Sequence, residues 1–119
     1  QDPTFGLTLL AETAQRALSP GVNDPGTAIE VMGRIERLLW ETLPEDTDAR
    51  DDDARFARVH LAPVTAAALL KASFPPIARC AKEAPEVLAW MDKALTALEH
   101  HPNAEMPGAV QDLRKSLLG

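Results

Sequence analysis

Apolar residues recur every three or four positions in five stretches of the chain, a spacing that places them on one side of a helix. These stretches cover residues 2–18, 25–43, 65–81, 85–101 and 107–118. The second stretch leaves only a narrow side for water, so we expect it to be the central helix. Its apolar face comprises Ala28, Val31, Met32, Ile35, Leu38 and Leu39. The pattern predicts an all-α fold in which about five helices pack as a small orthogonal or bundle-like domain.

Capping residues mark the beginnings of three predicted helices. Asp2 precedes Pro3 and Asp24 precedes Pro25, so each aspartate can cap a helix whose first residue is a proline. A proline at the first position of a helix costs no helical hydrogen bond, because an N–H at this position would have no partner within the helix. Thr65 can cap the third helix through its hydroxyl group.

Two adjacent prolines interrupt the third predicted helix. Pro75 and Pro76 each lack a backbone N–H, and each disfavours helical geometry in the residue before it. We therefore expect a kink or break near Ser73 and Phe74.

A polar acidic stretch follows the second helix, and residues 55–61 then alternate loosely between apolar and polar side chains. We interpret these seven residues as a short extended segment. A lone strand needs a partner, and the wide apolar face of the second helix needs more cover than short helices readily give. Both features predict a homo-oligomer.

The composition agrees with a folded helical domain. Hydrophobic residues make up 45% of the 119 residues and charged residues 25%. A formal net charge of −6, with no cluster of Lys and Arg, argues against nucleic-acid binding, because phosphate neutralisation supplies most of that affinity. No apolar run approaches the roughly 18 residues of a membrane-spanning helix. Because the chain begins at Gln1, directly before a helix-start signal, we expect residues 1–119 to be a single soluble domain of a longer protein.

The sequence contains no familiar catalytic or metal-binding grouping. Asp46 and Asp48 match the first two ligand positions of a calcium loop, but Arg50 occupies the third. His100 and His101 are adjacent and point in different directions on a helix, and a single cysteine cannot form a zinc box. We expect the histidines to interact with a helix C-terminus instead. The prediction is no enzyme, no metal and no cofactor.

Three further side chains are interpreted as core residues. Cys80 lies at a helix position where a buried cysteine behaves as a small hydrophobic residue. Trp40 and Trp90 fall on apolar helix faces and are expected to anchor the core.

The densest turn chemistry lies between the first two helices, in the stretch ALSPGVNDPGTA at residues 17–28. Its Pro, Gly and Asn residues form a tight turn, and the aspartate that caps the second helix would repel a phosphate at that helix N-terminus. We interpret the stretch as a capped interhelical corner. A ligand site is the alternative. Its candidate residues, which supply a cation, hydroxyl groups, an amide and a carboxylate, are Arg16, Ser19, Asn23, Asp24 and Thr27.

The same stretch resembles a motif of a bacterial family of predicted membrane proteins, domain of unknown function 2254. In that family several transmembrane helices precede D-x-x-F-G, followed by R-A-L-S-P-x-x-N-D-P-x-T-A. The matching positions in this chain are Asp2, Phe5, Gly6, Arg16, Ala17, Leu18, Ser19, Pro20, Asn23, Asp24, Pro25, Thr27 and Ala28. The chain departs from the motif at Gly26, where a bulky residue is common. The motif covers the first quarter of the chain.

The resemblance implies a parent protein in the bacterial inner membrane, attached through a transmembrane region N-terminal to these residues. It implies no activity, because none is assigned to the family. We expect an accessory domain that acts in assembly, gating or partner interaction. The alternative is a small-molecule or ion sensor with its site at the 16–27 corner.

Overall fold

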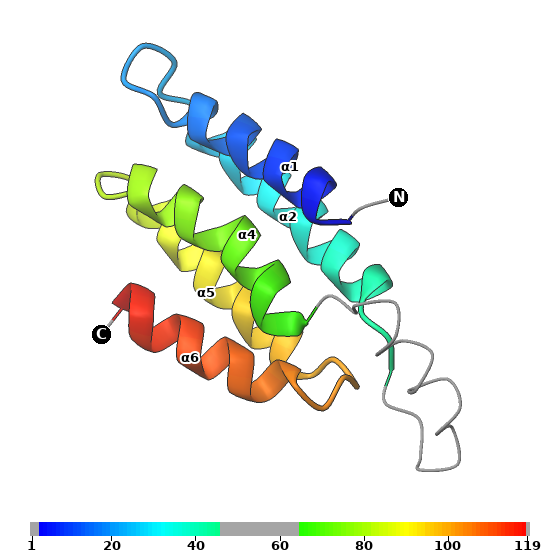
Figure 1. Ribbon diagram of the computed structural model, residues 1–119. Helices are drawn as coiled ribbons and strands as arrows, with labels where there is room; N and C mark the ends of the chain where they lie inside the picture. The colour runs from blue at the N-terminus through cyan, green and yellow to red at the C-terminus, as the bar shows by residue number, and fades with distance from the viewer. Residues whose placement is uncertain (1–2, 46–64, 119) are drawn as a thin grey trace, which may run out of the picture.

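The computed structural model describes residues 3–45 and 65–118, which form five helices (Figure 1). They are α1 (Pro3–Ala17), α2 (Pro25–Thr42), α4 (Ala66–Cys80), α5 (Pro85–Glu99) and α6 (Met106–Leu118). The predicted all-α fold is confirmed over these residues. The extended segment predicted at 55–61 and the cap predicted at Asp2 lie outside the described residues.

The helices lie in two layers that together form a bundle. One layer contains α1, α4 and α6, which run in the same direction, and the other contains α2 and α5, which run the opposite way (Figure 1). Each helix packs against two others in a closed ring, in the order α1, α2, α5, α6 and α4, and α4 returns to α1. Contacts between α2 and α4 cross the middle of the ring. The arrangement buries an apolar stripe of every helix.

The sequence predicts α2 as the central helix, but α2 and α4 each contact three other helices, so α2 alone is not central. The apolar face of α2 is buried inside the bundle. The buried residues of that face are Ala28, Val31, Met32, Ile35 and Leu39, each at most 5% exposed. The expectation that this face needs cover from a second copy is wrong, because α1 and α5 already cover it.

Helix α4 continues through its two prolines, so the predicted break does not occur. Pro75 and Pro76 remove two N–H donors from the helix, at a cost of about 3 kcal/mol or more for an interior proline. Apolar side chains on both sides of the prolines offset this cost, because Leu70, Phe74 and Ile77 are fully buried. Tertiary packing therefore overrides the local preference.

His101 and Asn103 attach the α5–α6 turn to the end of α2. Nε2 of the buried His101 donates to the carbonyl of Trp40 (2.9 Å), and its Nδ1 accepts the N–H of Asn103 (3.0 Å). The carbonyl of Trp40 lies in the last turn of α2, so His101 contacts a helix C-terminus, as expected, through a hydrogen bond from its ring. Asn103 donates from Nδ2 to the carbonyl of Pro44 (2.9 Å) and accepts the N–H of Glu105 (2.9 Å).

Arg114 fastens α6 to α5. Its guanidinium lies 2.5 Å from Glu99 Oε1 and 3.2 Å from Asp92 Oδ1, and it also donates to the hydroxyl of Thr96. The Arg114 side chain is 27% exposed, so water only partly screens these ion pairs. Both carboxylates come from α5, and α6 is thereby held along that helix.

The two tryptophans are not the core residues that the sequence predicts. Trp40 is 41% exposed and Trp90 is 48% exposed. The Trp40 ring packs edge-on against His101, with ring centroids 4.7 Å apart, and Lys93 Nζ lies 4.8 Å from the Trp90 ring centroid. Both indoles are therefore too exposed to belong to the buried core.

Candidate functional site between two helix corners

The corner between α1 and α2 is closely hydrogen bonded. The N–H of Asn23 donates to the carbonyl of Ser19 (2.7 Å), and the N–H of Asp24 donates to the carbonyl of Ala17 (2.6 Å). The hydroxyl of Ser19 donates to the carbonyl of Arg16 (2.8 Å). Asn23 has a φ of 48°, a left-handed conformation that asparagine adopts more readily than most residues. The turn therefore holds Ser19 and Asn23 in defined positions.

Asp24 and Thr27 bind each other as the cap of α2. The backbone N–H of Thr27 donates to Asp24 Oδ1 (3.1 Å), and its hydroxyl donates to Oδ2 (2.6 Å). These bonds, the hydroxyl bond first, favour the ionised carboxylate and lower the pKa of Asp24 below its ordinary value of 3.8. The predicted cap is confirmed, and both carboxylate oxygens are engaged in it.

Replacing Asp24 with alanine is expected to lower the melting temperature, because the first turn of α2 loses its side-chain acceptor. The folded-state pKa of Asp24 is lowered, so its stabilisation is present above pH 3.8 and is lost as the pH falls through that lowered pKa. Thermal unfolding of wild type and variant, at neutral pH and in acid, measures the difference. Asp24→Asn keeps one side-chain acceptor, so its melting temperature should lie between those of the wild type and Asp24→Ala. Equal melting temperatures at neutral pH would contradict the cap.

The corner faces the turn between α4 and α5 at the same end of the bundle (Figure 1), and the two turns enclose a cleft of about 680 Å³. The cleft residues from the first corner are Gln15, Leu18, Ser19, Pro20 and Asn23. Those from the second turn are Arg79, Cys80, Lys82, Glu83 and Ala84. We call this space the corner cleft. It is formed by segments that lie far apart in the sequence.

Two cations of the corner cleft have no carboxylate partner in the described part of the chain. Within residues 3–45 and 65–118, neither Arg79 nor Lys82 forms an ion pair, whereas Arg114 elsewhere in the bundle contacts two carboxylates. Glu83 is the acidic side chain among the residues that line the cleft. The cleft wall therefore carries a small excess of positive charge, although the chain as a whole is at −6.

A second hollow, of about 500 Å³, adjoins the corner cleft and shares Gln15 and Ser19 with it. It adds Glu12 and Arg16 of α1. Arg16 thus lies next to the cleft without lining it. The two hollows therefore adjoin each other at this end of the bundle.

Cys80 lines the corner cleft and is exposed, so the prediction of a buried cysteine is wrong. Cys80 is the last residue of α4. At this end of the helix Ile77 and Ala81 lie on the buried side, and Cys80 lies on the exposed side. Its Sγ lies 3.8 Å from Nε2 of Gln15. Cys80 therefore contacts α1 at the point where α1 and α4 meet in the cleft.

The five candidate residues separate into two groups in the structure. Ser19 and Asn23 line the corner cleft, and Arg16 lies in the adjoining hollow. Asp24 and Thr27 are engaged in capping and are absent from the residues that line the cleft. The ligand hypothesis therefore retains the first three residues, with a different set of neighbours.

The sequence reasoning missed Gln15, Arg79 and Lys82. Arg79 and Lys82 lie near the end of a predicted helix, where a basic residue is common because it complements the helix dipole. Nothing in that local pattern indicates a site. Only the packing of α4 against α1 brings these side chains beside the corner.

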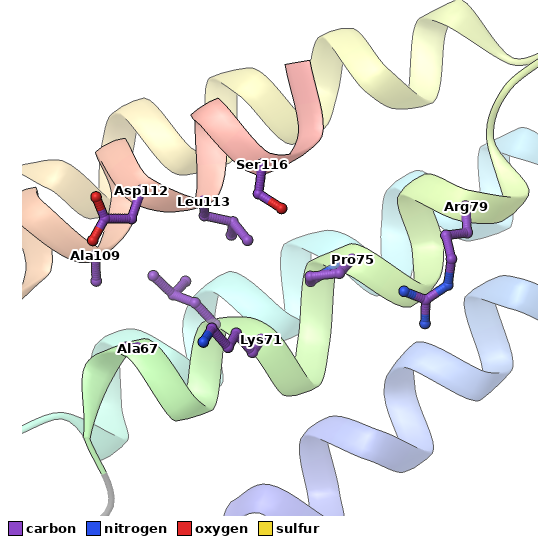
Figure 2. Close-up of a pocket in the computed structure, with 9 residues that line it drawn as sticks. Ala67, Lys71, Pro75, Arg79, Ala109, Asp112, Leu113 and Ser116 are labelled. Carbon is purple, nitrogen blue, oxygen red and sulfur yellow. The ribbon is translucent and has the colours of Figure 1, made fainter. Parts of the chain in front are cut away.

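A separate groove of about 400 Å³ runs between α4 and α6 (Figure 2). Its wall is largely apolar, with Leu70, Pro75 and Leu113, and polar groups such as Lys71 and Asp112 lie along it. Arg79 lines both this groove and the corner cleft. Any test of the cleft must therefore separate the two spaces.

Neither a membrane-spanning helix nor a metal site occurs among residues 3–45 and 65–118. No helix there combines the length and the hydrophobicity that crossing a bilayer requires. No group of three His, Cys, Asp or Glu side chains there is close enough to hold a metal ion.

The chain belongs to the family of predicted membrane proteins called DUF2254, which matches it over residues 1–97. Over 50 residues it is 44% identical to uncharacterised proteins of Mycobacterium bovis and of two strains of Mycobacterium tuberculosis. The matched stretch covers 39% of this chain and 10% of each relative, so it spans only a small part of those proteins. No solved structure matches the chain.

Proposed function

We propose that this chain is an accessory domain of a bacterial inner-membrane protein and that it acts through contacts with partners, in assembly or gating. Membership of a family of predicted membrane proteins supports the location. Exposed apolar side chains on α1 support the mode of action. The proposal assigns binding to the domain and no catalysis, because among the described cleft residues no histidine accompanies the Cys80 thiol or the Ser19 hydroxyl.

The observation that carries this proposal is an apolar pair on α1. Phe5 is 65% exposed and Leu9 is 45% exposed. The two residues are four apart, so they lie one above the other on the same helix face. This face points away from α2 and α4, which cover Leu7, Ala11 and Ala14 on the other side of α1. Apolar side chains grouped in this way are typical of contact surfaces.

We expect the isolated chain to form homo-oligomers through this face. Sedimentation velocity over a range of protein concentrations measures the association, and the variant Phe5→Ser/Leu9→Ser should shift the distribution to monomer. Val22→Ser is the matched control, because Val22 is a 59% exposed apolar residue on the corner and not on this face. Monomer at all concentrations in the wild type, or equal association in the double variant, would contradict the proposal.

The corner cleft favours a second function, that of a small-molecule sensor. Ser19 and Asn23 are held by the turn, and the cations of the second turn lie opposite them. A cleft of about 680 Å³ is within the size range of small-molecule sites. A ligand bound between the α1–α2 corner and the α4–α5 turn would hold the two helix pairs together. The domain could in this way signal to an attached membrane region that its ligand is bound.

A further inference from the structure

We propose that the corner cleft binds a phosphate group, with Arg79 and Lys82 as its charge partners and the amides of Gln15 and Asn23 as additional donors. This inference rests on the sensor function proposed for the same cleft. It names the class of ligand, a phosphorylated small molecule or a phosphate-bearing headgroup. These two sources share the chemistry that the cleft would recognise.

Charge distribution is the first argument. The chain is acidic overall at −6, yet Arg79 and Lys82 line one cleft, and Arg16 lies in the hollow that adjoins it. None of these three cations forms an ion pair within the described part of the chain. Arg114 shows the contrast, because two carboxylates and a hydroxyl surround it. The cleft cations are therefore available to an external anion.

The chemistry of the two cations favours phosphate over a carboxylate. A guanidinium presents a planar fork of donors, and an ammonium is a compact point charge. A phosphate monoester carries about −1.5 to −2 at pH 7 and three acceptor oxygens, so it can use both cations. A carboxylate carries one charge, which a single arginine already satisfies.

The surroundings of the cations allow a larger ligand than inorganic phosphate. Leu18, Pro20 and Ala84 provide an apolar part of the wall, and the space of about 680 Å³ exceeds what a phosphate ion fills. The turn fixes the backbone of Asn23 at the edge of the cleft, and an asparagine side-chain amide can donate to a phosphate oxygen. Glu83 also lines the cleft and offsets one of its two positive charges.

The position of Asp24 removes the earlier objection to an anion at this corner. Its carboxylate would repel a phosphate bound at the N-terminus of α2. Asp24 does not line the corner cleft, and both of its oxygens accept hydrogen bonds from Thr27. The proposed phosphate lies beside the opposite turn, toward α4 and α5.

The test is calorimetric titration of the whole chain with glycerol phosphate and with inorganic phosphate at low ionic strength. We expect binding to the wild type, and a loss of about tenfold or more in Arg79→Gln and in Lys82→Gln, since each removes a charge-assisted hydrogen bond. Lys115→Gln is the control for net charge, because Lys115 is exposed on α6 and lines neither space. Lys71→Gln is the control for the α4–α6 groove, since Lys71 lines only that groove.

Vesicles separate the two sources of the phosphate group. Binding to vesicles that contain phosphatidic acid, whose headgroup is a phosphate monoester, and not to phosphatidylcholine vesicles, lost in Arg79→Gln and Lys82→Gln, would support a lipid headgroup. Binding of glycerol phosphate with the same losses would support a free ligand. Binding that survives both substitutions, binding abolished by Lys71→Gln, or no binding of either probe would overturn the proposal.

Failure of the phosphate proposal is distinguishable from failure of the sensor function. The same titration with putrescine and with glycerol tests a cationic and a neutral ligand. If either compound binds and phosphate does not, the cleft remains a sensor site and the phosphate assignment is wrong. If none of the compounds binds, both proposals are overturned.

Discussion

Phe74→Ala is expected to lower the free energy of unfolding by about 3–5 kcal/mol, the usual cost of truncating a buried phenylalanine. Phe74 is 0% exposed and is the largest of the fully buried side chains in the described part of the chain. Its loss leaves a cavity in the middle of α4, on the residue that directly precedes the two prolines. Because the free energy of unfolding of a small domain is only about 5–15 kcal/mol, this variant should lose a large part of its stability. Urea unfolding followed by circular dichroism measures the change.

Phe5→Ala is the matched control for that experiment. It makes the same chemical change at a side chain that is 65% exposed on α1, so at protein concentrations low enough for the chain to be monomeric it should alter the free energy of unfolding by less than about 0.5 kcal/mol. The contrast between the two variants separates burial from the general effect of removing a phenyl ring. Equal destabilisation by both substitutions would show that the described core is not the one that stabilises the chain.

Asn103→Ala is expected to cost about 2 kcal/mol, since it leaves two backbone groups without their side-chain partner. These groups are the carbonyl of Pro44, at the end of α2, and the N–H of Glu105, before α6. Asn103 itself is 6% exposed, so water cannot readily replace it. Chemical denaturation measures the loss, and hydrogen exchange should show that the end of α2 opens more often.

Asn103→Asp tests which of the two bonds matters. The aspartate keeps an acceptor for the N–H of Glu105 and places a carboxylate oxygen against the carbonyl of Pro44. We therefore expect it to be at least as destabilising as alanine. Wild-type stability in either variant would contradict the role of this residue as the link between α2 and the α5–α6 turn.

The helix ends could be predicted from the sequence because they depend on neighbouring residues. Asp24 with Pro25 and Thr65 form their caps with N–H groups only three residues away. The fate of Pro75 and Pro76 could not be predicted, because it depends on how much apolar surface the whole bundle buries around α4. Neighbouring residues therefore determine where a capped helix begins. Tertiary packing determines whether a helix continues through residues that locally disfavour it, such as the two prolines of α4.

The candidate site was predictable only in part for the same reason. Periodicity indicates which side of a helix is apolar but does not give the depth of burial. The sequence therefore predicts that Trp40 and Cys80 are core residues, although both are exposed in the structure. Ser19 and Asn23 stood out because unusual turn residues surround them. Arg79 and Lys82 did not, since about sixty positions separate them from the corner, and their proximity arises from α1 packing on α4.

The most direct test of the corner cleft uses Cys80, the one cysteine of the chain, which lines the cleft and is exposed. The rate at which a thiol reagent alkylates Cys80 at constant pH reports whether the cleft is occupied. We expect glycerol phosphate to slow alkylation several-fold in the wild type and in Lys115→Gln, and to leave the rate unchanged in Arg79→Gln and Lys82→Gln. A wild-type alkylation rate that does not change at saturating glycerol phosphate would contradict a phosphate site between the two corners.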